Sequence, residues 1–303
     1  MSVISLFVGV IDIKPALLLA GDVEHLKIFV VSRLPRLLAI LCTGVGMSVA
    51  GLIMQQLCRN KFVSPTTGAT ISSAQLGILL ALLFQPHSTL RSRAGFAFVT
   101  AILGTWLFVW FIQRIQFKDV VLVPLVGIMF GNVVSGVTSY LAYKYEMTQA
   151  LSSWLTGHFS MVLKGRYEIV YLVVPLVILA FLFANHFNIV GMGRDFSENL
   201  GVHYNLVLFL GLTIAAMITA SVVVVVGSIS FLGLIVANLS RQLLKTYRHS
   251  VLICGSVCFG MLVLVGGQLI VEHVYAYAIP VSVFITVFGG IYFLYLLLTE
   301  RRT

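Results

Sequence analysis

Residues 51–70 read GLIMQQLCRNKFVSPTTGAT, and they interrupt an otherwise hydrophobic run from residue 37 to residue 84. Pro65 has no backbone N–H to donate, and it restricts Ser64 to extended backbone angles. We therefore expect one helix to stop near Cys58 and another to begin after Pro65. The stretch predicts a turn between two helices, mainly structural, with a minor share in lining the inner end of a path across the membrane.

The composition indicates an integral membrane protein. Hydrophobic residues make up 59% of the chain and charged residues 10%, whereas a soluble domain is roughly 25% charged. A helix needs about 20 apolar residues to cross the hydrocarbon core. The chain offers many charge-free runs of about that length or longer, at 37–58, 62–90, 94–113, 120–143, 147–163, 169–193, 199–240, 249–271 and 273–299.

The hydrophobic runs lack the alternation of barrel strands, so they predict spanning helices. The run 199–240 is too long for one crossing, and we expect it to divide at residues 227–230. Residues 1–13 are only about half a span and lack a positive n-region, so we expect a truncated first helix and a mis-assigned start codon. The sequence predicts a single all-α polytopic domain, residues 1–303, with about ten transmembrane helices.

Catalytic motifs are missing from the sequence. It contains no phosphate loop, no H-E-x-x-H zinc helix and no G-x-S-x-G nucleophile turn, which argues against an ATPase, a hydrolase or a polytopic membrane enzyme. Cysteines and histidines lack metal-site spacing, so no metal is expected. The acids lie near predicted span ends, Glu272 being the nearest to an exception. This disfavours a secondary, ion-coupled transporter of a small polar solute, which stays as the alternative.

Small and polar residues form stripes on two predicted helices. Asn132, Ser135 and Ser139 share one face of the helix at 120–143, and Ser282 and Thr286 share one on the last helix. Such stripes are typical of close helix packing. The sharper interpretation is a polar translocation path or an interface between two permeases.

A charged segment between two spans predicts a short helix with an apolar edge. It comprises Asp195, Phe196, Ser197, Glu198, Asn199, Leu200 and Gly201. Asp195 favours a helix N-terminus and Gly201 a C-terminal stop. The plainer interpretation is a solvated loop.

Several motifs together resemble the permease family of ABC importers for ferric siderophores, haem and cobalamin. They are Arg33-Leu34-Pro35-Arg36, the opening stretch, Ser153-Trp154-Leu155-x-Gly157, GRDFSENLG at 193–201, GSISFLGLIV at 227–236 and FLYLLL at 293–298. Asn60 to Thr67 and Asn238 are most similar to the branch for catecholate or catecholate-citrate siderophores. Departures are Ala237 for proline, Ala278 for glutamate, Ser282 for glycine, and Gly266, Gly267 and Gln268 in place of an aspartate and an arginine.

The resemblance implies a type II ABC importer permease in a bacterial cytoplasmic membrane. Its expected partners are a second, related but different permease, two cytoplasmic ATPase subunits and an extracytoplasmic siderophore-binding lipoprotein. Residues 195–201 would be the contact with the ATPase. ATP and Mg would be used by the ATPase, and no cofactor is expected on this chain. The net charge of +9 fits anionic membrane lipid without nucleic acid.

The resemblance also implies a role for Arg33 and Arg36, which flank a proline just before the second span. In the family, arginines at this position receive acidic residues of the binding protein. A rigid guanidinium fork suits that task because it can hold a carboxylate with two hydrogen bonds. The alternative is that both side chains extend to lipid phosphates.

Overall fold

Helices make up almost all of the described part of the chain. The computed structural model describes residues 23–66, 69–85, 87, 89–114, 122–160, 162–165, 167–246, 248–274 and 279–300. Within those ranges, β-type pairing is confined to one isolated bridge between Thr156 and Ser228. The expected truncated span at residues 1–13 lies outside them.

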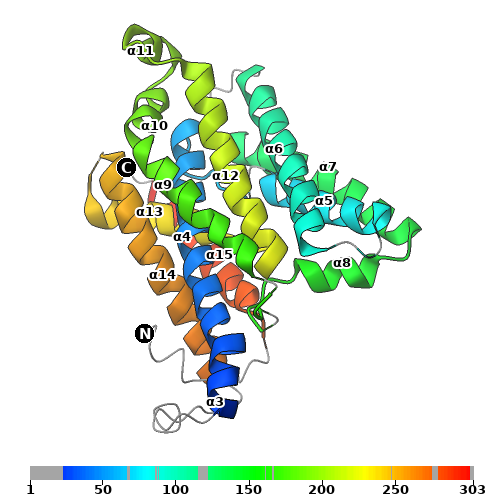
Figure 1. The fold of residues 1–303 in the computed structure, drawn as a ribbon. Helices are drawn as coiled ribbons and strands as arrows, with labels where there is room; N and C mark the ends of the chain where they lie inside the picture. Colours follow the sequence, from blue (N-terminus) through cyan, green and yellow to red (C-terminus); the bar gives the residue numbers. More distant parts are fainter. Residues whose placement is uncertain are drawn as a thin grey trace.

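The second span is a continuous helical segment at the centre of the bundle. It consists of α3 (Val23–Ile28), a π-helical turn at Phe29–Arg33 and α4 (Leu34–Leu57), and it counts as one apolar segment from Leu26 to Leu57. α4 contacts α9, α12, α13 and α14, whose bounds follow below. In Figure 1, the blue α4 runs behind α9 and α12.

Glycines let the neighbours of α4 approach its backbone. A Cβ added at Gly44 would lie 2.7 Å from the carbonyl oxygen of Gly260, and one at Gly51 would collide with the carbonyl of Gly233. Small residues are what allow helix backbones to pack this closely inside a membrane. The glycine-rich second span is therefore the element on which the other helices converge.

The remaining elements follow in chain order, and they confirm an all-helical, multi-pass fold. They are α5 (Thr70–Phe84), α6 (Leu90–Arg114), α7 (Leu122–Lys144), α8 (Thr148–Leu155), a 3₁₀ turn (Glu168–Leu172), α9 (Val173–Leu182), α10 (Ala184–Gly191), α11 (Arg194–Asn199), α12 (Tyr204–Val226), α13 (Leu232–Leu244), α14 (His249–Val274) and α15 (Val281–Glu300).

Five helices in the described residues are long and apolar enough to span a membrane. A sixth candidate is the pair Glu168–Leu182 and Ala184–Gly191, which is bent by 60°, and α5, α13 and α15 are shorter apolar helices. Each of the charge-free runs given above thus contains helix in the described residues. α11 lies at one end of the bundle and α3 at the opposite end (Figure 1).

The turn after α4 differs from the prediction in where the next helix begins. α4 ends at Leu57 as expected, but α5 begins at Thr70 and not directly after Pro65. The intervening chain is held by side-chain amides: Asn60 Oδ1 accepts a hydrogen bond from the backbone N–H of Phe62 at 2.9 Å, and Asn238 Nδ2 donates to the carbonyl of Lys61 at 2.9 Å. These bonds satisfy buried polar groups and so favour an ordered non-helical segment.

The division of residues 199–240 is confirmed. α12 ends at Val226 and α13 begins at Leu232. Gly227 separates them with a φ of +91°, a left-handed conformation that glycine adopts without a steric penalty.

Candidate translocation path

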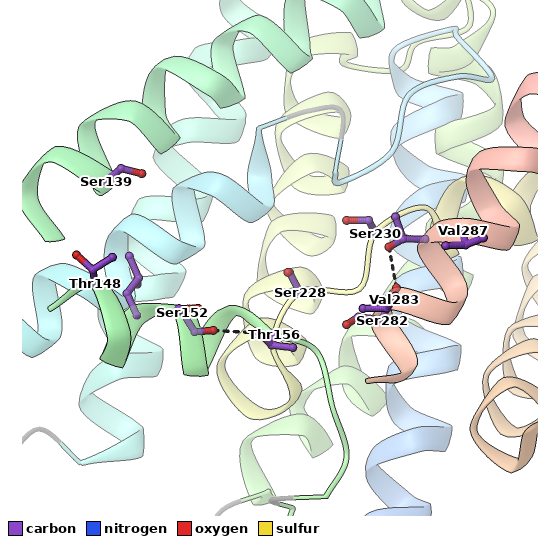
Figure 2. Close-up of a pocket in the computed structure, with 11 residues that line it drawn as sticks. Ser139, Thr148, Ser152, Thr156, Ser228, Ser230, Ser282, Val283 and Val287 are labelled. Carbon is purple, nitrogen blue, oxygen red and sulfur yellow. Dashed lines mark hydrogen bonds between the residues drawn. The ribbon is translucent and has the colours of Figure 1, made fainter. Parts of the chain in front are cut away.

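A cavity of 520 Å³ opens between α7, α8, the α12–α13 connection and α15. Most of its lining side chains carry hydroxyl groups, and Figure 2 shows them approaching from these separate elements. The lining consists of Ser139, Thr148, Leu151, Ser152, Thr156, Ser228, Ser230, Ser282, Val283, Thr286 and Val287.

Backbone contacts bring three distant segments together at this cavity. Thr156 and Ser228 form the isolated bridge, and the backbone N–H of Ser282 donates to the carbonyl of Gly157 at 3.2 Å. A Cβ at Gly157 would collide with the carbonyl oxygen of Ser228, so a side chain at this position would separate the segments. Two of the sequence motifs, 153–157 and 227–236, therefore meet in space at the cavity.

The structure places three of the five predicted path residues at the cavity and two elsewhere. Ser139, Ser282 and Thr286 are among its lining residues. Ser135 instead donates a hydrogen bond to the Oγ of Ser72 on α5 at 3.2 Å. Asn132 is exposed on α7 and does not line the cavity. The stripe on α7 thus serves helix packing at one position and the cavity at another.

Five hydroxyl-bearing residues of the cavity were missed by the sequence analysis. A signal was present for some of them, because hydroxyl groups recur every fourth residue along α8 and therefore share one helix face. The missed residues are Thr148, Ser152, Thr156, Ser228 and Ser230.

The lining is polar, but its described residues carry no charge. The Thr286 hydroxyl donates to the carbonyl of Ser282 at 2.7 Å, and the Thr156 hydroxyl donates to the carbonyl of Ser152 at 3.1 Å. A hydroxyl whose proton is held by its own helix still offers oxygen lone pairs to a solute. Such a surface can form weak hydrogen bonds with a polar solute without binding it tightly. Among the described residues, no three His, Cys, Asp or Glu side chains are grouped as metal ligands.

One end of the bundle contains a buried charge cluster. The guanidinium of Arg36 pairs with the carboxylate of Glu272 on α14, and their side chains are only 11% and 1% exposed. Gln268 Nε2 donates to the same carboxylate at 2.9 Å. Gln268 is one of the residues that replace the charged pair expected in the ninth span, and here it supports Glu272.

The surroundings of the two arginines differ from the prediction. We expected both to precede the second span, but they lie within its continuous helical segment, and Arg33 is only 7% exposed. A π-helical turn precedes Pro35, and the helix continues through this position although proline has no backbone N–H to donate. Arg36 can be buried there because Glu272 supplies a counter-charge.

The opposite end of the bundle carries the predicted short helix, α11. Gly193 and Gly201 bound it with φ values of +121° and +75°, and Ser197 Oγ donates to the carbonyl of Gly193 at 2.6 Å. Phe196 and Leu200 remain 48% and 56% exposed on one face, four residues apart. A helix anchored on one side with an apolar edge on the other suits insertion into a groove of another protein.

The sequence departures have different surroundings. Ala237 is fully buried in α13, whereas Ser282 adds a hydroxyl to the cavity. Ala278 and the side chains of Ser153, Trp154 and Leu155 lie outside the described residues.

An all-helical multi-pass membrane protein with a neutral, hydroxyl-lined cavity has the properties of a transport permease. Residues 1–299 match the FecCD transport family, and the chain belongs to that family. It is 42% identical to the petrobactin import system permease protein YclN of Bacillus subtilis (strain 168), with 99% of this chain and 95% of that protein covered. It is 34% identical to the petrobactin import system permease protein FatD of Bacillus anthracis, with 100% and 89% covered.

The fold also matches solved structures. A structure described as an inward-facing metal-chelate type ABC transporter aligns with a TM-score of 0.79 at 22% identity, covering 98% of this chain and 94% of that chain. This likeness concerns the fold alone.

Proposed function

We propose that this chain is the membrane-spanning permease subunit of an ATP-driven importer that moves a ferric siderophore into the cytoplasm across a bacterial cytoplasmic membrane. The observation that carries the proposal is the hydroxyl-lined cavity built where two family motifs meet α15. The substrate class is supported by the names of the relatives, two of which are petrobactin import permeases. Asn60 to Thr67 and Asn238 resemble the branch for catecholate or catecholate-citrate siderophores, so a chelate of that kind is the expected cargo.

A second, different permease is the expected partner in the membrane. The chain is similar to both petrobactin import permeases of Bacillus subtilis, at 42% identity to YclN and 30% to YclO. α15 lines the cavity, and it also carries exposed apolar side chains, among them Val287, Phe288 and Ile291, that provide a surface for that partner. The cavity would then be closed by the two permeases together.

The energy source is assigned to another chain. The sequence has no phosphate loop, so ATP and Mg would be used by two cytoplasmic ATPase subunits, and this chain would bind no cofactor. The exposed edge of α11, formed by Phe196 and Leu200, is the proposed contact. Glu272 is absent from the cavity lining, so a proton-coupled carrier gains no support from it.

The extracytoplasmic binding lipoprotein is proposed to dock at Arg33 and Arg36. Arg36 already binds a carboxylate within the chain, which is the kind of group that the proposal requires it to bind. An acidic side chain of the binding protein would have to compete with Glu272 or share the guanidinium with it. Replacing both arginines with glutamate should weaken docking in a salt-sensitive way, and lysine should have an intermediate effect.

Docking is measured as the affinity of the binding lipoprotein for reconstituted transporter, with a charge-reversed lipoprotein as the matched partner for the glutamate variant. Recovery of affinity with that partner supports direct contact. Undiminished affinity in the double glutamate variant would assign the arginines to lipid or to helix packing.

The function itself is tested by growth. Cells lacking this gene and any permease that replaces it should fail to grow on a ferric catecholate or catecholate-citrate chelate as the sole iron source, yet grow on ferrous iron. Expression of this chain should restore growth. Restoration by this chain with the partner ATPase deleted would contradict the proposal.

A further inference from the structure

A second cavity, of 600 Å³, lies near the end of the bundle that carries α11 and is separate from the hydroxyl-lined path. Its lining comes from α4, α10, α13, the α13–α14 turn and α14, and it includes Gln56, Asn188, Met192, Arg241, Lys245 and Thr246. Apart from Gln56, which belongs to the stretch 51–70, these residues have no part in the transport role described above.

The cavity concentrates positive charge without a matching acid. Arg241 and Lys245 both line it, and the described lining contains no Asp or Glu. Among the described residues, Arg241 makes one hydrogen bond, from Nη2 to the Oε1 of Gln56 at 3.5 Å, which is at the long limit for such a bond. A partly buried guanidinium that meets only a neutral amide is poorly compensated, because buried charges are normally paired.

The positive charge extends to the turn after α4. Burial and, secondarily, the charge of Arg241 lower the pKa of Lys61. Lys61 therefore lies within the electrostatic reach of Arg241. An anion bound between Arg241 and Lys245 would relieve this repulsion.

The surroundings of the cavity favour a lipid as the source of that anion. Met192 lines it and is 52% exposed, and Leu243 and Val251, on the helices that flank the turn, are also exposed. Apolar side chains around a basic pocket suit acyl chains beside a phosphate group, and basic pockets between membrane helices bind anionic headgroups. Arginine can hold a phosphate with two parallel hydrogen bonds.

We propose that the cavity between α4, α10 and α13 binds the phosphate headgroup of an anionic phospholipid through Arg241 and Lys245. Gln56 and Asn188, whose side chains are joined by a 3.4 Å hydrogen bond from Gln56 Nε2 to Asn188 Oδ1, supply further polar contacts. The bound headgroup would connect α4, α10 and α13 directly beside the Met192–Gly193 joint that leads into α11. The site does not depend on the transported solute.

Binding is measured on the full-length permease, purified in lipid-depleted detergent and titrated with phosphatidylglycerol, phosphatidylcholine or inorganic phosphate. Native mass spectrometry and the midpoint of thermal unfolding report lipid binding. We compare Arg241→Gln and Lys245→Gln with Arg248→Gln, which removes an exposed cation of the same turn that does not line the cavity. Arg241→Lys keeps the charge if Arg241→Gln does not yield folded protein.

Phosphatidylglycerol should bind and stabilise the unmodified protein and Arg248→Gln, and phosphatidylcholine should not. Loss of a charge-assisted contact should weaken phosphatidylglycerol binding about tenfold or more in Arg241→Gln and measurably in Lys245→Gln. Equal binding by Arg241→Gln and the unmodified protein would overturn the proposal. Equal protection by inorganic phosphate would also overturn it, because that result would indicate a free-anion site.

Discussion

Replacing Glu272 with glutamine should destabilise the protein strongly, because it removes the charge of a buried ion pair. The two side chains are 11% and 1% exposed, so water cannot take over the role of the carboxylate. Breaking a buried pair by removing one partner costs about 3–5 kcal/mol, and an exposed pair about 0–1 kcal/mol. Glutamine keeps an acceptor oxygen for Arg36, so we expect a loss near the lower limit, about 3 kcal/mol.

A double-mutant cycle separates the pair from the other contacts of each residue. The free energy of unfolding in mixed micelles is measured for Glu272→Gln, for Arg36→Met and for the double variant. Independent losses would add, but the double variant should be more stable than that sum by about 2 kcal/mol or more, since neither charge is then buried alone. Glu146→Gln, which changes an exposed acid, should stay within about 0.5 kcal/mol. A coupling energy below about 0.5 kcal/mol would refute this account of the cluster.

Three further predictions concern the exposed edge of α11, the hydroxyl-lined cavity and the packing around α4. Replacing Phe196 and Leu200 with aspartate should abolish transport and copurification of the ATPase while the permease still inserts, and normal uptake would contradict the coupling role. A cysteine at Ser282 should react with a water-soluble thiol reagent in at least one nucleotide state, and protection in every state would assign this position to packing. Gly233→Ala should cost about 1–3 kcal/mol, because the new Cβ would lie 2.5 Å from the carbonyl oxygen of Met47. Gly95→Ala, with open space around it, should not destabilise the protein, and equal unfolding free energies for the two variants would contradict this.

Local features were predictable from the sequence because they depend on neighbouring residues. The break near residues 227–230 follows from a run too long for one crossing, and Gly227 confirms it with its left-handed backbone. The short helix at α11 follows from an acid at its start and a glycine after its end. The helix that follows Pro65 begins only at Thr70. The turn before Pro65 is held by Asn60 and by Asn238, and Asn238 is distant in sequence.

Long-range contacts could not be predicted from spacing alone. Arg36 and Glu272 are 236 residues apart, so the chain between them gives no sign that they pair. The cavity likewise needs Thr156, Ser228 and Ser282, which meet through backbone contacts. The sequence identified Ser282 by its helix face, but it could not reveal which other segments that face meets.

The central claim, that this chain is the membrane subunit of an ATP-driven importer, is tested most directly by transport in proteoliposomes. The permease is reconstituted with its partner permease, the ATPase and the binding lipoprotein, and uptake of radiolabelled ferric siderophore is followed. We expect uptake that requires Mg-ATP on the side of the membrane where the ATPase subunits lie. Uptake should continue after an ionophore collapses the proton gradient, and it should stop when ATP hydrolysis is blocked. Uptake driven by an ion gradient without ATP would contradict the claim and favour a secondary carrier.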